Sequence, residues 1–399
     1  MKARDCDVVI IGAGVAGLAA AGALSRAGKT VRCLEATDRI GGRILTVHDP
    51  LSPVAIELGA EFVHGRPPEI FDIIRNGPLT AHELDRNGGE EFLPKSLGRK
   101  DASFEDYIRW SHHPQAAKNW ARRYVEGFNA ARSELISLRS LKQDADAAAN
   151  IEGDRSFRLP GGYDQVPLAL LRSISQQSAV VQLNSIVERV QWRRGAAQVH
   201  YRSAVDGRSE RLRCRQVVIT ASLGVLQAGA IQFDPEPTAV LDAARRLKLG
   251  HVYRITFRFE TAFWESDAGF LFSKEKRFPT WWTTRPVVSP VLTAWMAGSA
   301  AEGFQNSDPV PEALRSLARI LKGKVPRPEA AYFHNWQADP FFRGAYSYVP
   351  VDGLPARETL AQPVDGTLFF AGEATNHQGY GATVHGAIGS GFQVADQLL

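Results

Sequence analysis

The sequence predicts an α/β protein of two domains, and three observations lead to this prediction. A short apolar strand, a glycine-rich turn, a helix and a second strand follow one another over residues 7–34. Strand-like patterns return over residues 180–220 and 368–371. The 399 residues exceed what a single hydrophobic core usually holds, so we expect two domains, which interleaved segments of the chain could build.

Composition excludes several other classes of protein. The chain is 44% hydrophobic and 23% charged, which is typical of a globular protein and not of a disordered or collagen-like chain. The net charge of +4 is mild and the basic residues are spread out, so we expect no nucleic-acid partner. Cys6, Cys33 and Cys214 lack metal-ligand spacing, which predicts free thiols in a reducing compartment and no metal site.

The longest apolar stretch, residues 8–24, does not have the pattern of a membrane span or signal peptide. Four glycines interrupt it, and Asp5 and Asp7 precede it. The chain also ends without a hydrophobic tail. We therefore expect a soluble, cytoplasmic protein with no membrane partner.

The elements follow in order along the chain. We expect a strand over 7–11 that is buried on both faces, a helix over 15–27 and a strand over 30–34. Aromatic and apolar residues at helical spacing predict several amphipathic helices within 103–149. Strands are then expected over 180–190, 197–203 and 211–220.

Strict alternation over 252–259 predicts a further strand, with Arg254 on one of its faces. Strands over 281–284 and 291–297 and a helix over 311–321 complete this part of the chain. A buried strand over 368–371, a glycine-rich loop and a helix that opens at Thr383 close the sequence.

Gly12, Gly14 and Gly17 form a dinucleotide-binding fingerprint between the first strand and the first helix. Gly12 permits a tight turn, Gly14 lets a pyrophosphate approach the backbone, and Gly17 permits close packing of the helix on the strand. Glu35 follows the second strand, where its carboxylate would accept hydrogen bonds from ribose hydroxyls. The fingerprint by itself does not distinguish FAD from NAD.

A second glycine motif lies four residues beyond Glu35. Arg39 and Arg43 flank a pair of glycines that includes Gly42. Arg43 would neutralise a pyrophosphate through a bidentate contact, and the glycines would let the chain pass close to it. The alternative is that both arginines are solvated surface charges.

With these motifs the sequence resembles the flavin-dependent amine oxidase family, closest in motif style to polyamine oxidases and flavin-type lysine demethylases. The resemblance is carried by residues 9–17, 34–43, 57–65, 159–162, 217–226, 336–348 and 369–392. It implies FAD bound to a Rossmann-like domain that is interleaved with a substrate domain of sheet plus helices. We assign residues 1–76, 155–226 and 335–399 to the FAD domain, and residues 77–154 and 227–334 to the substrate domain.

The resemblance also implies roles for single residues near FAD. Val187 would meet the adenine region through its backbone, and Gly372 and Glu373 would lie near the pyrophosphate and ribityl chain. Thr383 and Val384 would meet the N1 and C2-carbonyl side of the flavin, where the positive end of the last helix favours negative charge. The segment that runs past the flavin ring would be Gly59, Ala60, Glu61 and Phe62.

Tyr346 matches one wall of the aromatic cage that orients the substrate amine in this family. Thr383 stands at the opposite wall, with Tyr380 nearby, so the cage resembles that of polyamine oxidases and demethylases. The alternative for Tyr346 is a core aromatic residue of a strand. Ala345 occupies the position at which monoamine oxidases carry a flavin-linked cysteine, which predicts non-covalent FAD.

Two further positions bear on catalysis. Arg254 stands where the family usually carries a lysine that holds a water against flavin N5; it could keep this role, slow the reaction with oxygen, or be an exposed strand residue. His64 aligns with a substrate-facing position, and the alternative is a histidine satisfied by the backbone. Glu61 adds a carboxylate beside it. His112, His113, His377 and His385 show no metal-ligand spacing and are assigned no site.

Together these observations predict an FAD-dependent oxidoreductase that acts on a small primary or secondary amine, including a di- or polyamine. Hydride would pass from the carbon next to nitrogen to flavin N5, giving an imine, with oxygen or another compound as electron acceptor. The alternatives are a flavin-dependent desaturase or isomerase, an amine dehydrogenase with poor oxygen reactivity, a chromatin demethylase and a non-catalytic flavin-binding protein.

Overall fold

A five-stranded parallel sheet forms the centre of one half of the molecule in this computed structural model, which describes residues 4–84, 92–94, 96–304 and 308–399. Strand order is β21-β12-β1-β2-β8. Its strands are β1 (Val8–Ile11), β2 (Val31–Leu34), β8 (Ala179–Gln182), β12 (Gln216–Ile219) and β21 (Leu368–Phe370). Every residue of β1 is buried, as expected for a central parallel strand with both faces covered.

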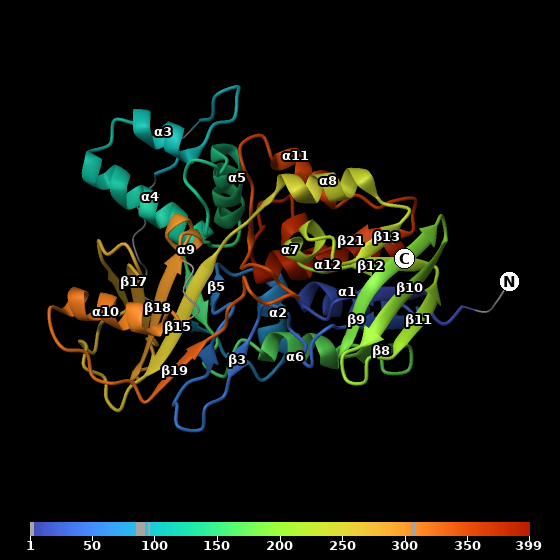
Figure 1. Ribbon diagram of the computed structural model, residues 1–399, viewed down its shortest axis with the longest axis horizontal. Coiled ribbons are helices and arrows are strands. Elements are labelled where there is room, and N and C mark those ends of the chain that lie inside the picture. Colours follow the sequence, from blue (N-terminus) through green and yellow to red (C-terminus); the bar gives the residue numbers. More distant parts are fainter. Residues whose placement is uncertain (1–3, 85–91, 95, 305–307) are drawn as a thin grey trace.

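Helices cover the parallel sheet, and the pairing of α1 (Val15–Arg26) with α12 (Val384–Leu398) joins the two ends of the chain (Figure 1). Small residues make this close packing possible, because a Cβ at Gly391 would overlap the Ala16 carbonyl oxygen. The neighbouring helices are α2 (Pro68–Asn76), α6 (Gln165–Arg172), α7 (Leu223–Gln227), α8 (Thr238–Arg246), α11 (Leu354–Leu360) and the short 3₁₀ helix η1 (Glu373–Thr375).

A second, four-stranded sheet packs beside the parallel one. Its order is β11-β10-β9-β13, and β9 and β10 form a long antiparallel pair. The strands are β9 (Ser185–Arg193), β10 (Ala196–Ser203), β11 (Ser209–Cys214) and β13 (Gln232–Asp234).

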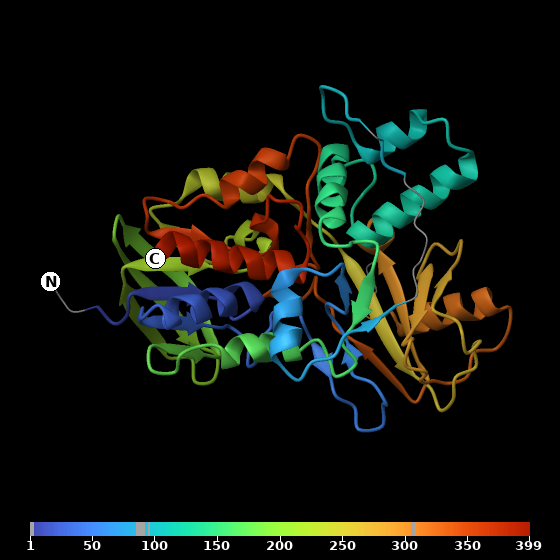
Figure 2. The same ribbon diagram turned by 180° about the vertical axis from the view of Figure 1, so that it is seen from behind.

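The other half of the molecule contains a five-stranded antiparallel sheet with α10 (Val310–Leu321) on it, at the opposite end from the first sheets in both views (Figures 1 and 2). Its order is β16-β17-β18-β15-β19. The strands are β15 (Val252–Arg258), β16 (Phe270–Phe272), β17 (Thr280–Thr283), β18 (Val291–Ala297) and β19 (Ala330–Phe333). All of β15 is buried, so the alternation in its sequence does not mark an exposed face.

Three helices form a layer above this sheet, as the helical spacing within 103–149 predicts. They are α3 (Phe104–Trp110), α4 (Gln115–Asn129) and α5 (Leu138–Ala149), and the short α9 (Ser299–Glu302) follows β18. Short strands connect the two halves: β3 (Thr46–Val47), β4 (Ile56–Glu57), β5 (Phe62–His64), β6 (His82–Glu83), β7 (Ser156–Arg158), β14 (Lys248–Leu249) and β20 (Ser347–Tyr348).

The architecture is of the α/β class that the sequence predicts. All five strands of the parallel sheet come from the three segments assigned to the FAD domain, and the large antiparallel sheet comes from 227–334. The residue boundaries between the domains stay a prediction. Among the described residues, no helix combines the length and the apolar character needed to span a bilayer.

Candidate functional site

The turn after β1 brings two glycine-rich segments together. Gly12 has φ +104°, and a Cβ at this position would lie 2.7 Å from Thr220 Oγ1. Gly14 forms an isolated bridge with Gly41, and a Cβ on Gly42 would lie 3.3 Å from Gly14 Cα. The amino terminus of α1 therefore faces a second stretch of bare backbone, which is the arrangement that lets a pyrophosphate reach backbone amides.

Glu35 lies at the end of β2 and is 6% exposed. Its Oε2 accepts a hydrogen bond from the Ala13 N–H at 2.7 Å, and its Oε1 accepts from Thr37 N and Oγ1 at 3.0 and 2.8 Å. These bonds hold the carboxylate beside the turn. Because each carboxylate oxygen has two lone pairs, Glu35 can still accept hydroxyl donors.

Arg43 and Glu373 form an ion pair between the second glycine motif and η1. Arg43 Nη1 donates to Glu373 Oε1 at 2.8 Å and to the Ala345 carbonyl at 2.7 Å. The Ser347 hydroxyl donates to Glu373 Oε2 at 2.6 Å. Burial acts to raise the pKa of Glu373, but the charge of Arg43 and these hydrogen bonds outweigh it, so the pKa is lowered and the group stays ionised.

Thr383 is the N-cap of α12. Its Oγ1 accepts from the Gly386 N–H at 3.0 Å and donates to the Tyr380 carbonyl at 2.7 Å. The Thr383 hydroxyl is thus used within the chain, and the first amides of α12, at Val384 and His385, have no acceptor within the helix.

Arg254 is buried on β15 and fastens the segment of residues 59–62. It is 5% exposed, so the alternative of an exposed strand residue is wrong. Its Nη1 donates to the Gly59 carbonyl at 2.7 Å and its Nη2 to Glu61 Oε2 at 2.5 Å. Its Nε is buried without a hydrogen-bond partner among the described residues.

Glu61 is shared by two guanidinium groups and an indole. Arg158 Nε donates to Glu61 Oε1 at 2.8 Å, and Trp282 Nε1 donates to Oε2 at 3.0 Å. Burial acts to raise the pKa of Glu61, but the charges of Arg254 and Arg158 outweigh it and lower the pKa. Close by, burial raises the pKa of Glu57 to about 7.

Tyr346 and His64 meet at α4. The Tyr346 hydroxyl donates to the Phe128 carbonyl at 2.8 Å, and the His64 ring packs edge-on against the Phe128 ring at 5.2 Å. His64 Nδ1 lies 3.3 Å from Ser156 Oγ, so its partner is a side chain and not the backbone. Burial lowers the pKa of His64 to about 4, which leaves the ring neutral at pH 7.

Aromatic rings continue from this point into the antiparallel sheet. We call the following residues the aromatic wall: Phe62, His64, Phe128, Phe270, Trp282 and Trp295. Phe62 contacts the rings of Phe270 and Trp282 with centroids 5.9 and 5.6 Å away, and Trp282 contacts Trp295 at 5.6 Å. The Trp295 Nε1 donates to the Gly127 carbonyl, so the wall presents mainly apolar surface.

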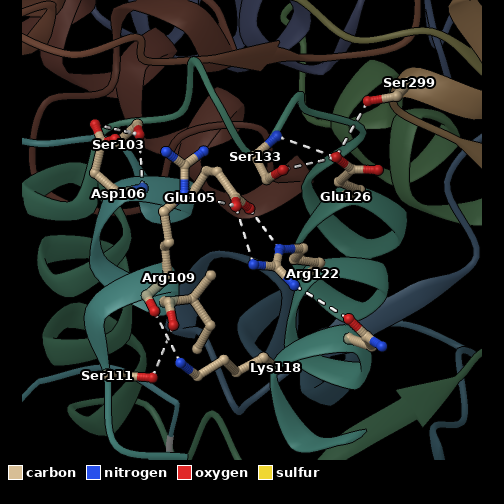
Figure 3. A network of polar contacts seen from close by, with 12 residues as sticks. Ser103, Glu105, Asp106, Arg109, Ser111, Lys118, Arg122, Glu126, Ser133 and Ser299 are labelled. Atoms are coloured by element: carbon tan, nitrogen blue, oxygen red, sulfur yellow. Dashed lines mark hydrogen bonds and ion pairs between the residues drawn. The ribbon is translucent and has the colours of Figure 1, made fainter. Parts of the chain in front are cut away.

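Ion pairs and hydrogen bonds hold α4, which carries part of this wall (Figure 3). Arg122 of α4 donates to both oxygens of Glu105 on α3, at 2.5 and 2.9 Å. Glu126, further along α4, accepts from Ser133 and Ser299 at 2.9 and 3.1 Å. The Glu126 carboxylate is therefore engaged by the protein itself.

A cavity of about 1540 Å³ connects these features. It is lined by most of the sequence-predicted residues: Gly12, Gly14, Glu35, Gly42, Arg43, Gly59, Ala60, Glu61, Phe62, His64, Val187, Arg254, Tyr346, Gly372, Glu373, Thr383 and Val384. Gly17 and Arg39 are not among its lining residues. Gly17 lies beneath the turn, where a Cβ would overlap the Gly12 carbonyl oxygen, and Arg39 donates to the Ile44 carbonyl at 3.0 Å.

Arg357, Asp144 and His385 are among the ionisable residues of the same cavity to which the sequence analysis assigns no role. Arg357 and Asp144 line it from α11 and α5, and His385 lines it from the first turn of α12. The His385 Nε2 is buried without a partner among the described residues. The sequence around Arg357 and Asp144 has no motif that indicates a site, because only the packing of distant helices brings them to the cavity. For His385, the position in the first turn of a helix that follows a glycine-rich loop could have indicated a place in the site.

The groups that line this cavity fit FAD. Bare backbone at the α1 turn, a carboxylate at the end of β2 and the Arg43–Glu373 pair lie along one cavity that reaches the amino terminus of α12. The cavity is also large enough for a ligand of this size with room for a substrate. Nitrogen atoms of Arg357 and His385 are buried without a hydrogen-bond partner among the described residues, which indicates that the cavity binds a ligand with polar groups.

Comparisons with known proteins place the chain in a family. A family model described as "Flavin containing amine oxidoreductase" matches residues 15–132 and 79–399. The chain is 30% identical to "Lysine-specific histone demethylase 1 homolog 2" of Oryza sativa subsp. japonica over 98% of its length, and to "Protein FLOWERING LOCUS D" of Arabidopsis thaliana over all of it. It covers 57% and 56% of these two relatives, so it spans about half their length.

Solved structures confirm the α/β fold with a Rossmann-like domain. Putrescine oxidase with bound putrescine matches with a TM-score of 0.81 at 23% identity, covering 98% of both chains. Cyclohexylamine oxidase from Brevibacterium oxydans IH-35A matches with a TM-score of 0.79 at 21% identity, covering 99% of this chain and 98% of that one. On the family match and the relatives, the chain belongs to the flavin-containing amine oxidoreductases, enzymes whose cofactor is FAD.

Proposed function

We propose that this protein oxidises small amines that carry an apolar body, with non-covalent FAD as the hydride acceptor. The observation that supports this most directly is the single cavity that runs from the α1 turn past residues 59–62 to Tyr346. FAD, when bound, supplies the hydride-accepting atom N5. The imine that leaves the site hydrolyses to an aldehyde or ketone.

Tyr346 and Thr383 are proposed to confine the reacting amine. The Tyr346 hydroxyl is tied to the Phe128 carbonyl, which holds the ring in one position. The neutral amine is the reactive form, because its lone pair supports the developing iminium. His64, whose pKa burial lowers to about 4, adds no positive charge that would oppose this change.

Arg254 is proposed to act as a positioning residue beneath the cofactor. Both of its terminal nitrogens hold the 59–62 segment, and its charge is offset by Glu61. A guanidinium committed in this way is a poor substitute for a lysine that holds a water. This arrangement supports slow reduction of oxygen, and therefore an acceptor other than oxygen.

The proposed substrate is a monoamine and not a di- or polyamine. A second ammonium buried in the cavity would need a carboxylate of its own. Glu61, which accepts from Trp282 of the aromatic wall, is already paired with Arg254 and Arg158, so it does not offer a second ammonium an unpaired carboxylate. An apolar ring, by contrast, gains contact with the wall.

None of the three cysteines lines the cavity, which supports non-covalent attachment of FAD. Denaturation of the purified protein should release all of its flavin into the supernatant. A flavin that stays with the precipitated protein would contradict this part of the proposal.

The decisive experiment is anaerobic reduction of the bound flavin. A panel of cyclohexylamine, benzylamine, putrescine and spermidine is added without air, and loss of flavin absorbance is followed; oxygen or an artificial quinone is then admitted. We expect reduction by the first two amines and faster reoxidation by the quinone. If no amine reduces the flavin but a saturated carbon substrate does, the protein is a desaturase; an isomerase would convert its substrate without net reduction of the flavin.

A further inference from the structure

Arg357 is a buried cation that the proposed amine oxidation does not use. It lies in α11, is 2% exposed and lines the cavity. Among the described residues, its Nε and Nη1 are buried without a hydrogen-bond partner. A guanidinium normally satisfies its donors when it leaves water, so these two nitrogens indicate a missing acceptor.

Its acidic neighbours do not provide that acceptor. Asp144 Oδ1 lies 3.8 Å from Arg357 Nη1, which is an ion pair without a hydrogen bond. Burial raises the pKa of Asp144 to about 6 although the charge of Arg357 opposes the shift, so the carboxylate is still mostly ionised at pH 7 but makes no hydrogen bond to the guanidinium. The Glu373 carboxylate is close enough to feel the charge of Arg357, but its oxygens are taken by Arg43 and Ser347.

Gly381 leaves space for the guanidinium of Arg357 in the cavity. A Cβ at residue 381 would overlap Nη1, Cζ and Nη2 of Arg357, so the absence of a side chain there is what admits the group. Two residues further on, Thr383 begins α12, a helix of 15 residues. The first residues of this helix, Val384 and His385, line the same cavity, and their amides have no acceptor within the helix.

We propose that Arg357 binds a negatively charged group inside the cavity, beside the amino terminus of α12, whose favourable interaction with negative charge on the flavin the family resemblance already implies. Two sources have this chemistry: the flavin ring when it gains negative charge on reduction, and a carboxylate carried by the amine substrate. In both cases the ligand presents oxygen or nitrogen acceptors to the free nitrogens of Arg357 and to the α12 amides.

Two probes separate these sources in the FAD-loaded protein. Sulfite adds to the flavin and leaves negative charge on its ring, whereas benzoate is a carboxylate that the flavin cannot oxidise. Both perturb flavin absorbance, so each gives a dissociation constant without turnover. A failure of this inference is therefore distinct from a failure of the proposed amine oxidation.

The test compares Arg357→Met with Arg357→Lys and, as control, with Arg202→Met, at a partly exposed arginine of β10 that does not line the cavity. We expect Arg357→Met to weaken sulfite or benzoate at least tenfold, Arg357→Lys to recover part of the loss, and Arg202→Met to change neither. If Arg357→Met weakens only the binding of sulfite, the site binds the negatively charged flavin ring. If it weakens only the binding of benzoate, the site binds a carboxylate of the substrate.

Dissociation constants for both probes within twofold of wild type, at unchanged flavin content, would overturn the inference. Should Arg357→Met fail to fold, Gly381→Ala gives a second test, because the added methyl group displaces the guanidinium while keeping its charge in the protein. For Gly381→Ala too, we expect the dissociation constant of sulfite or benzoate to rise at least tenfold, and values within twofold of wild type would overturn the inference.

Discussion

Arg43 Nη1 and Glu373 Oε1 lie 2.8 Å apart, although the two residues are 330 positions apart in the chain. The pair joins the second glycine motif, near the amino terminus, to η1, which follows the last strand of the parallel sheet. It therefore links two distant segments of the chain at the proposed pyrophosphate position through one ionic contact.

We expect Arg43→Met to reduce both FAD retention and stability. The substitution leaves Glu373, which is 5% exposed, without its ionic partner. Breaking a buried pair costs about 3–5 kcal/mol; the partial exposure of Arg43 lowers this to roughly 2 kcal/mol. The flavin-to-protein absorbance ratio and the melting temperature measure the two effects, with Arg43→Lys as the milder control. Full retention of FAD in the Met variant would contradict the assignment of Arg43.

Arg254→Lys should speed reoxidation of the reduced flavin by oxygen, by about tenfold or more. A lysine cannot donate to Gly59 and Glu61 in the fork geometry of the guanidinium, so its ammonium would be free to hold a water. Stopped-flow mixing of the reduced protein with oxygen measures the rate. Arg258→Lys is the matched control, because Arg258 lies on the same strand but pairs with Asp49 and Glu329 and does not line the cavity. Equal rates in wild type and Arg254→Lys would show that this side chain does not act near N5.

Phe270→Ala should weaken the binding of apolar amines. Phe270 contacts both Phe62 and Trp282 in the aromatic wall, and removal of one such ring costs roughly 1–2 kcal/mol of ligand contact, or about tenfold in affinity. The concentration dependence of anaerobic flavin reduction by cyclohexylamine gives the apparent dissociation constant. Val288→Ala, at an exposed apolar residue outside the cavity lining, serves as control. An unchanged value for Phe270→Ala would place the substrate elsewhere.

Glu57 should make stability fall as pH rises from about 4.5 to about 7. Burial raises its pKa from 4.5 to about 7 in the folded protein, so within this window the folded state binds more protons than the unfolded state. The stabilisation is complete below pH 4.5 and is lost as pH passes 7, by at most about 3 kcal/mol. Urea unfolding between pH 5 and 8 tests this. Glu57→Gln, which can still accept from Tyr163 N–H and donate to Thr46, should show a flatter profile.

Most residues of the proposed FAD site were identifiable from the sequence, because they belong to short local motifs. Gly12, Gly14 and Thr383 lie in single turns where neighbouring residues determine the backbone, and Glu35 reaches the first of these turns from the end of the next strand in the same βαβ unit. The apolar character of 8–11 likewise predicts a strand covered on both faces, and β1 is buried throughout.

Contacts between distant segments could not be predicted in this way. Alternation over 252–259 gives no sign that both faces of β15 are buried, or that Arg254 would be committed to Gly59 and Glu61. Nothing near Arg357 in the sequence indicates that Gly381 would make space for it. Burial and partners of a charged group depend on which helices and strands pack around it.

From its sequence alone, then, this protein was predicted to be an α/β dinucleotide-binding protein, because backbone geometry at glycine turns and helix starts is a local property. Its assignment as a flavoprotein of the amine oxidase type came from the resemblance of its motifs to that family. Only the tertiary structure decided which charges are already paired and which remain free in the cavity. That outcome depends on the packing of α5, α11, β5 and β15, whose residues meet only when the chain has folded.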